Sequence, residues 1–323
     1  MGDKVAVNAR LISAETGAQV WADRFDGERG RLGELQAEFV SRLANSLGWE
    51  LLKAESLRAM RERPNNPDAA DFAMRGEIIL RSSPNGREEY NEARALFERA
   101  LALDPQNLPA MIGLTNVLTD RLIDLASPDP EKDVARAEET INAALALQPD
   151  NSSAHRQKGY VQITKRQYAS AISEFEKAIA EDPNNAYAHA DASFWKVAIG
   201  TVEFTGIEKA FRLSPHDPSA PWWQFDMCRL DDHLAQWEQA VEWCNKAVAG
   251  KPGFWWPIAD LAIANAWAGH DREAKEAVAQ LQKVYPGFTV QGFLGFHWTD
   301  NPTFNAQYER MAEGLRKAGL PEK

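Results

Sequence analysis

Hydrophobic residues alternate with polar ones in two short segments near the start of the chain. The first segment covers residues 5–12 and the second covers residues 20–25, with Glu15, Thr16 and Gly17 between them. Alternation over this length is typical of half-buried strands, and glycine favours a turn. The pattern therefore predicts a β-hairpin over residues 5–25.

From Leu32 onward the hydrophobic period becomes that of an α-helix. Apolar residues recur at four-residue intervals, namely Leu35, Phe39, Leu43, Leu47 and Leu51, until prolines at 64 and 67 break the pattern. This spacing predicts a long amphipathic helix. Because two strands and one helix bury too little surface to be stable alone, we expect residues 1–66 to be part of a domain that continues upstream.

A repeated Ala-x4-Pro pattern follows. Its prolines are 44, 34, 32, 37 and 34 residues apart, at Pro105, Pro149, Pro183, Pro215, Pro252 and Pro286. Self-similarity near 34 residues indicates an array of helix-turn-helix units. The fold class is therefore expected to be mainly α.

The repeat resembles the tetratricopeptide repeat (TPR). The best copy is 152–185, in which the TPR positions for small, aromatic and helix-ending residues are held by Gly159, Ala171, Phe175, Ala178 and Pro183. Small residues let two antiparallel helices approach, and proline ends a helix. The resemblance implies a right-handed TPR α-solenoid of about six units over residues 67–301, preceded by the hairpin and the long helix.

Some units depart from the pattern. An insertion around 125–130 accounts for the 44-residue spacing, and residues 199–206 lack the small residue of a second helix, so a shortened fourth unit is expected. Residues 302–323 are expected to form a C-terminal capping helix, because Pro302 and Gly319 provide its start and stop signals.

The segment Val5–Phe25 also resembles the closing hairpin of the TolB amino-terminal-like (FlgO-like) domain. In bacterial proteins that domain joins an upstream class III adenylate/guanylate cyclase domain, or a winged-helix regulator, to TPR units. The tail from Pro286 to Pro321 is similar to the tails of the same cyclase-linked proteins. No part of a cyclase catalytic domain is recognised in the chain, so the resemblance assigns no catalytic residue here.

Charge narrows the choice of partners. The chain of 323 residues has 36 Lys and Arg against 47 Asp and Glu, a net charge of −11, which disfavours nucleic acid. No apolar run reaches the roughly 18 residues of a membrane span, so direct membrane insertion is not expected. A cytoplasmic location follows, with the periplasm as the alternative if a membrane span precedes the TolB-like part.

Candidate chemistry is sparse. Cys228 and Cys244 fall on packing positions of the fifth repeat and are expected to be reduced core residues. His155 and His189 occupy equivalent repeat positions and are expected to pack rather than to bind metal, and residues 231–233 (Asp-Asp-His) are expected to form a solvated helix cap. We expect no catalytic residues, no metal and no cofactor, and therefore no enzymatic activity.

The first helices of TPR units line the concave face, which suggests a binding groove. The repeat phase directs eight side chains toward it, namely Arg156, Tyr160, Trp222, Phe225, Arg229, Trp256, Ile263 and Trp267. Nine of the eleven tryptophans lie at or after Trp195, and aromatic and arginine side chains commonly anchor interfaces. The alternative is that these aromatics pack between repeats. The basic clamp of chaperone-binding TPR proteins is not evident.

The leading hypothesis is a non-enzymatic scaffold that binds a protein or peptide segment in the groove, in a cyclase-type signalling system. One alternative is the C-terminal regulatory fragment of an adenylate/guanylate cyclase. The other is a small-molecule or glycan sensor that uses the aromatic cluster. A homodimer through the strand edge at Val5–Ile12 is also expected to be possible, because an exposed edge can pair with another chain.

Overall fold

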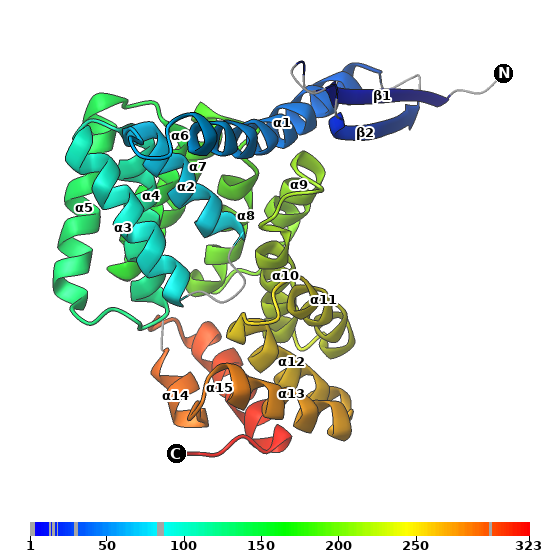
Figure 1. Cartoon of the computed structure of the whole chain (residues 1–323). Coiled ribbons are helices and arrows are strands. Elements are labelled where there is room, and N and C mark those ends of the chain that lie inside the picture. Colours follow the sequence, from blue (N-terminus) through cyan, green and yellow to red (C-terminus); the bar gives the residue numbers. More distant parts are fainter. Residues whose placement is uncertain are drawn as a thin grey trace.

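The computed structural model describes residues 4–12, 14, 17, 19–28, 32–82, 87–296 and 299–323. Strands β1 (Lys4–Ile12) and β2 (Gln19–Glu28) form an antiparallel hairpin in which Lys4 lies opposite Glu28. The hairpin projects away from the helices (Figure 1). The predicted hairpin is thus confirmed, and its outer surface includes the exposed side chains of Val7 and Ile12.

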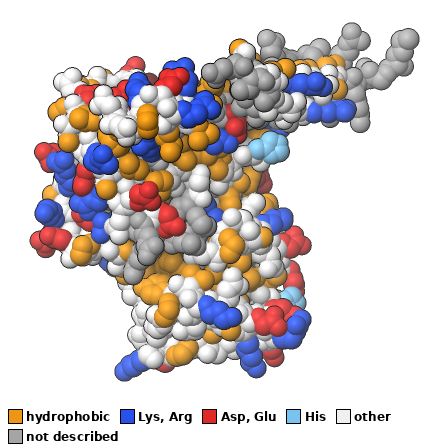
Figure 2. Space-filling model, viewed as in Figure 1, with side chains coloured by type: hydrophobic (Ala, Val, Ile, Leu, Met, Phe, Trp, Pro, Cys, Tyr) orange, Lys and Arg blue, Asp and Glu red, His pale blue; other side chains and the backbone are white. Residues whose placement is uncertain are grey.

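Helix α1 (Leu32–Glu62) bridges the repeat array from its first unit to its fourth, because it contacts both α2 and α9. Polar bonds hold it there: the Ser41 hydroxyl donates to Asn184 Oδ1 at 2.6 Å, and Asn45 Nδ2 donates to the Leu213 carbonyl at 3.0 Å. The expected apolar stripe is only partly buried, since Leu51 is exposed. Figure 2 shows hydrophobic side chains exposed among charged ones on the face that α1 crosses.

Helices α2 to α13 form six consecutive antiparallel pairs, which confirms the predicted mainly α solenoid. The pairs are α2 (Ala69–Ser82) with α3 (Arg87–Leu103), α4 (Leu108–Ile123) with α5 (Pro130–Leu147), α6 (Ser152–Thr164) with α7 (Tyr168–Glu181), α8 (Ala186–Phe194) with α9 (Thr205–Leu213), α10 (Ala220–Leu234) with α11 (Trp237–Gly250), and α12 (Trp255–Ala268) with α13 (Asp271–Val284). Glycine is required where paired helices cross: a Cβ on Gly159 would lie 2.4 Å from the Phe175 ring. We call the face formed by the first helix of each pair the inner face.

The fourth unit is shortened, as the sequence predicted. Helix α8 ends at Phe194 and continues as a 3₁₀ turn, η2 (Trp195–Ile199), which stops at Gly200 with a φ of 87°. The long connection between α4 and α5 also lies where the insertion was expected, with Leu125 at a φ of 50°. Irregular spacing in the sequence therefore marks irregular backbone.

After the repeats, α14 (Val290–Gly295) and α15 (Pro302–Ala318) return over the C-terminal units. Helix α15 packs on α10 and α12 (Figure 1), so it covers the inner face of the last two pairs. Its apolar stripe is buried there and consists of Phe304, Tyr308, Met311 and Leu315. Asn301 caps its start and Gly319 ends it at a φ of 91°.

The buried side chains form two apolar clusters that meet within α6. One extends from Phe72 to Val161 and the other from Ile163 to Leu320. No described helix is long and apolar enough to cross a lipid bilayer.

Candidate functional site

The inner face of the first five helix pairs encloses a cavity of about 230 Å³. Its walls come mainly from α2, α4, α6, α8 and α10, with Trp256 of α12 at one end. This volume lies below the range of about 300–1,000 Å³ typical of pockets for drug-sized ligands. The cavity therefore has room for a side chain or a small molecule rather than for a folded element.

Five of the eight predicted groove residues line this cavity. They are Arg156, Tyr160, Trp222, Phe225 and Trp256. The half-buried Trp222 packs on Phe254 with a centroid distance of 4.0 Å. The walls are thus aromatic on the side of α10 and α12, where the tryptophans of the sequence accumulate.

The other three predicted residues lie outside the cavity, and the prediction that they face an open groove is wrong. Arg229 and Ile263 are fully buried. Trp267 stacks on Trp237 at 5.8 Å and donates from Nε1 to the Arg310 carbonyl of α15 at 3.1 Å. The physical reason is that α15 fills the inner face at this point, which the repeat phase could not reveal.

The packing alternative applies to part of the aromatic set. Trp223 is buried between Tyr187 and Phe211, with centroid distances of 5.5 and 5.6 Å. Trp255 stacks on Trp256 at 3.9 Å and contacts Phe288 at 4.9 Å. Both tryptophans thus pack against other aromatic rings, and Trp223 lines the cavity as well.

Two guanidinium groups of the cavity already have carboxylate partners. Arg156 Nε donates to Asp191 Oδ2 at 2.5 Å, and the Tyr160 hydroxyl donates to the other oxygen of Asp191 at 2.8 Å. Arg81 Nε donates to Glu77 at 2.6 Å. Burial alone would lower the pKa of Arg156, but the nearby charge of Asp191 raises it, so this cation stays charged.

For other carboxyl groups in the cavity, nearby cations offset less of the cost of burying a negative charge. Burial raises the pKa of Asp120 to about 7, and the neighbouring charge of Asp124 adds to the effect. Burial also raises the pKa of Asp226 well above its ordinary value, with the charge of Asp191 contributing. Carboxyl groups that bind their protons this tightly lie where negative charge is costly.

A chain of amides runs along the floor between α4 and α6. Asn116 Nδ2 donates to Asp120 at 2.7 Å, and Gln157 Nε2 donates to Asn116 Oδ1 at 2.6 Å. Gln157 is only 2% exposed, and its Oε1 has no hydrogen-bond partner among the described residues. The cavity wall therefore contains a buried acceptor without a donor.

Most of these polar residues were missed by the sequence analysis, although the repeat contains a signal for them. Gln157, Asp191, Asp226 and Asp260 follow one another at intervals of 34, 35 and 34 residues. They occupy one equivalent position on α6, α8, α10 and α12, two residues before the glycine position that Gly159 represents. We call these four residues the inner polar ladder.

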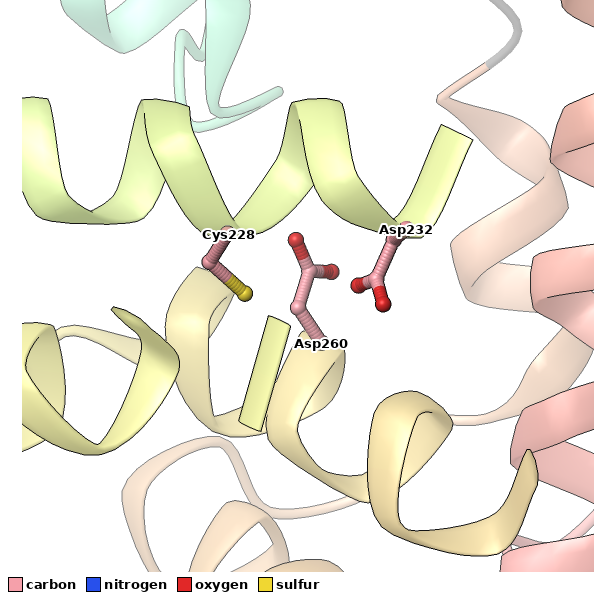
Figure 3. A group of neighbouring side chains, drawn as sticks. All are labelled: Cys228, Asp232 and Asp260. Carbon is pink, nitrogen blue, oxygen red and sulfur yellow. The ribbon is translucent and has the colours of Figure 1, made fainter. Parts of the chain in front are cut away.

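The last member of the ladder lies in a second cluster, beneath α15. Arg229 donates from Nε and Nη2 to the two oxygens of Asp260 at 2.5 and 2.7 Å. Figure 3 shows Asp232 and Cys228 of α10 pointing toward Asp260 of α12. Asp232 is fully buried, and neither of its carboxylate oxygens has a hydrogen-bond partner among the described residues.

Cys228, Asp232 and Asp260 place possible ligand atoms within 4.8 Å of one another. However, Cys228 forms a disulfide with Cys244, and Asp260 is already paired with Arg229. The cluster therefore does not fit a metal ion. Burial and the charge of Asp260 raise the pKa of Asp232 well above its ordinary value, so this carboxyl keeps its proton.

The disulfide corrects the expectation that both cysteines are reduced. Cys228 and Cys244 are 16 residues apart, as are Gly159 and Phe175, whose side-chain positions touch in the third unit. Two cysteines at these positions bring their Cα atoms to 5.2 Å, which is within the range that a disulfide requires. The repeat positions of the two cysteines were predicted correctly, but the contact between these positions was not predicted.

The solvated cap expected at residues 231–233 is also wrong. Asp231, Asp232 and His233 are all buried, because α15 covers the end of α10. His233 Nδ1 lies 2.9 Å from Gln307 Oε1 of α15, and burial lowers the pKa of this histidine to about 3. The group belongs to the seam between α10 and α15.

The packing role expected for the two repeated histidines is confirmed. His155 Nε2 lies 2.8 Å from the Pro149 carbonyl, and His189 Nε2 lies 3.0 Å from the Pro183 carbonyl. Each imidazole thus binds the backbone at the end of the preceding unit.

The comparisons with known proteins agree with this architecture. A family model described as "Tetratricopeptide repeat" matches residues 153–185. A segment of 120 residues is 28% identical to "Putative adenylate cyclase 3" of Rhizobium meliloti (strain 1021); the match covers 36% of this chain and 20% of that protein.

Solved structures resemble the chain in fold. A human IFIT1 dimer with m7Gppp-AAAA aligns over 91% of this chain and 67% of its own, with 19% identity and a TM-score of 0.57. The APC/C hetero-tetramer Cut9-Hcn1 aligns over 83% of this chain and 47% of its own, with 14% identity and a TM-score of 0.55. The chain therefore has the fold of a TPR solenoid and contains a recognised tetratricopeptide repeat at residues 153–185.

Proposed function

We propose that the protein is a non-enzymatic interaction module that binds a peptide or protein segment at the cavity of the inner face. The observation that carries this proposal is the cavity itself, which has five of the residues predicted from the repeat phase in its walls. Trp222 and Arg156 are of the residue types that most often anchor interfaces. TPR solenoids are suited to this role because their curvature creates extended concave surfaces.

The test compares two tryptophans of similar exposure. Trp222 lies in the cavity wall, whereas Trp243 of α11 stacks on Phe211 at 5.8 Å outside it. Proteins retained on immobilised wild-type chain are identified by mass spectrometry, and each is then measured in purified form against Trp222→Ala and Trp243→Ala. The proposal expects only Trp222→Ala to weaken binding by tenfold or more. Equal binding by both folded variants would reject the cavity as the binding surface.

The cyclase context is the finer part of the proposal. It is supported by the similarity to the Rhizobium meliloti protein over a fifth of that protein's length and by the TolB-like pattern of residues 5–25. We propose that residues 1–66 form part of a TolB-like segment, residues 67–301 the TPR units and residues 302–323 the capping helix. In this context the chain acts as the scaffold, or as the C-terminal regulatory part, of an adenylate/guanylate cyclase system.

Two further properties belong to this proposal. Strand β1 offers an edge for a homodimer, and Val7→Lys, at an exposed β1 position, tests it by light scattering, since a charge on an edge opposes pairing. The Cys228–Cys244 disulfide favours the periplasmic alternative over the cytoplasm, because disulfides persist in oxidising compartments.

The second candidate function is a small-molecule sensor. The observation that favours it is the size of the cavity, about 230 Å³, which suits a small ligand as well as a side chain. A ligand that binds only the folded state raises the melting temperature further as its concentration increases above its Kd. Stabilisation by a small molecule, without any protein partner, would favour the sensor.

A further inference from the structure

The inner polar ladder shows a repeating arrangement in which a buried aspartate holds a guanidinium. Asp191 of α8 binds Arg156, and Asp260 of α12 binds Arg229. Each aspartate accepts two hydrogen bonds, Asp191 from Arg156 and Tyr160, and Asp260 from the two nitrogens of Arg229. Both pairs join adjacent units, because each arginine comes from the unit before its aspartate.

Asp226 lies between these two pairs in the ladder and lacks the equivalent cation. It lines the cavity, and it forms no hydrogen bond or ion pair with any described residue. The side chain that stands one unit earlier, at the repeat position of Arg229, is Phe194. At this position of the ladder the chain therefore has an aspartate, but the preceding unit has no arginine to pair with it.

A second acceptor in the same cavity also lacks a donor. Gln157 is the first member of the ladder, is 2% exposed and has an unpaired Oε1. A buried polar atom without a partner costs free energy, so such an atom in a cavity wall points to a missing donor. The cavity lining thus contains two acceptors without donors among the described residues, Gln157 on α6 and Asp226 on α10.

The charges and rings around them suit a cation. Among the described lining residues there are five carboxyl groups, namely Glu77, Asp120, Asp124, Asp191 and Asp226, but only two guanidiniums, Arg81 and Arg156. Arg156 lies 5.0 Å from the Tyr187 ring centroid, and Lys251 lies 5.5 Å from that of Trp222. The aromatic walls therefore already hold two of the chain's own cations, as expected for ring faces near positive charge.

We propose that the cavity binds the guanidinium of an arginine side chain from the partner segment, with Asp226 as its acceptor and Trp222 in the same wall. This inference rests on the proposed function, because it names the group by which the peptide is recognised. A planar guanidinium fits a carboxylate with two parallel hydrogen bonds, which a lysine ammonium cannot reproduce. The incoming arginine completes the ladder between the Asp191 and Asp260 pairs.

The experiment uses the full chain and tryptophan fluorescence. The probes are N-acetyl-arginine amide and its neutral analogue N-acetyl-citrulline amide, each alone and within an otherwise identical Ala/Ser heptapeptide. The proposal expects the arginine probes to bind at least tenfold more tightly than the citrulline probes. It also expects Asp226→Asn to abolish this difference.

The matched control is Asp271→Asn, which removes the same charge from the first turn of α13, far from the cavity lining. It should bind the arginine probes as the wild type does, and all variants should melt within a few degrees of it. Equal affinity for citrulline, or an unchanged preference in Asp226→Asn, would overturn the guanidinium inference while leaving peptide binding intact. Binding of the arginine amide but not of the arginine heptapeptide would instead overturn the peptide function. Failure of every probe to bind would overturn the inference as well.

Discussion

The two ends of the inner face are built from the same repeat, but one end is hollow and the other is filled by a helix. Between α2 and α10 the face is hollow, and its ladder residues Asp191 and Asp226 border a cavity. At α10 and α12 it is filled by α15, and Asp260 lies in a dry seam with Arg229. The repeat therefore determines which side chains point inward, while the segment after the last repeat determines whether they meet solvent or protein. Substitutions at the two ends should therefore have different effects.

The largest expected effect comes from breaking the buried pair of the filled end. Arg229→Met leaves Asp260 without its cation and beside Asp232, both fully buried. Removing one partner of a buried ion pair typically costs about 3–5 kcal/mol. Urea unfolding followed by circular dichroism should show this loss in the free energy of unfolding.

The control for that variant is Arg316→Met on α15, which breaks a solvent-accessible pair with Glu322 beyond the end of the helix. Exposed pairs contribute little, so its unfolding curve should overlay that of the wild type. If both variants unfolded alike, the seam would be no more dependent on its charges than the surface.

The next effect concerns the disulfide, which ties α10 to α11 at the filled end. Cys228 and Cys244 enclose a short loop, and closing a loop of about 15 residues is worth roughly 3 kcal/mol. A Cys228→Ala/Cys244→Ala variant should lose about this much stability, and reductant should destabilise the wild type but not the variant. Two titratable thiols in the unreduced native protein would contradict the disulfide.

A smaller effect should follow from crowding the seam at Gly314 of α15. A Cβ there would lie 2.9 Å from Ile263 Cγ2 and 2.8 Å from Trp267 Nε1. Overpacking costs about 1–3 kcal/mol, which exceeds the gain of up to about 1 kcal/mol from replacing a helical glycine by alanine. Gly314→Ala should therefore be less stable than the wild type in thermal melts.

Gly48→Ala on α1 is the matched substitution, because nothing lies within 4 Å of a Cβ at Gly48. It should be neutral or stabilising. Stabilisation by both substitutions would mean that α15 is not tightly seated on α12.

The sequence predicted much of the inner face, but it did not predict what covers the C-terminal end of that face. The period and phase of the repeat predicted the helix pairs, the shortened fourth unit and the inward direction of Arg156, Trp222 and Ile263. They could not show that α15 would dock on the inner face, because its apolar stripe carries no information about which surface it meets. For the same reason Arg229 was expected in an open groove.

The polar residues were overlooked for another reason. Repeat families are recognised by small and large packing positions, such as Gly159 and Phe175, and the position two residues before the glycine is not part of that pattern. The regular spacing of Asp191, Asp226 and Asp260 was present in the sequence. Its meaning depends on contacts between units, namely which aspartates find an arginine, and these contacts appear only in the folded structure.

The smallest expected effect distinguishes the two ends by pH. Asp120 in the cavity has a pKa of about 7, raised by burial and by Asp124 and Asp191, and opposed by Arg156 and Lys251. Since the folded state holds this proton more tightly than the unfolded state, its contribution to stability is present at low pH and is lost as pH rises through 7. At the filled end, His233 with a pKa of about 3 stays neutral over the same range.

The wild type should therefore lose about 1 kcal/mol of stability relative to Asp120→Asn between pH 6 and pH 7, because each pH unit between the unfolded and folded pKa values is worth up to about 1.4 kcal/mol. His233→Gln should leave the slope of stability against pH unchanged between these values. The same ionisation should make the cavity a better site for a cation, so the affinity of wild type for N-acetyl-arginine amide should rise between pH 6 and 8, and that rise should be smaller in Asp120→Asn. If His233→Gln changed the pH dependence and Asp120→Asn did not, the titrating group would lie in the seam under α15. The hollow end and the filled end would then not differ in the way proposed.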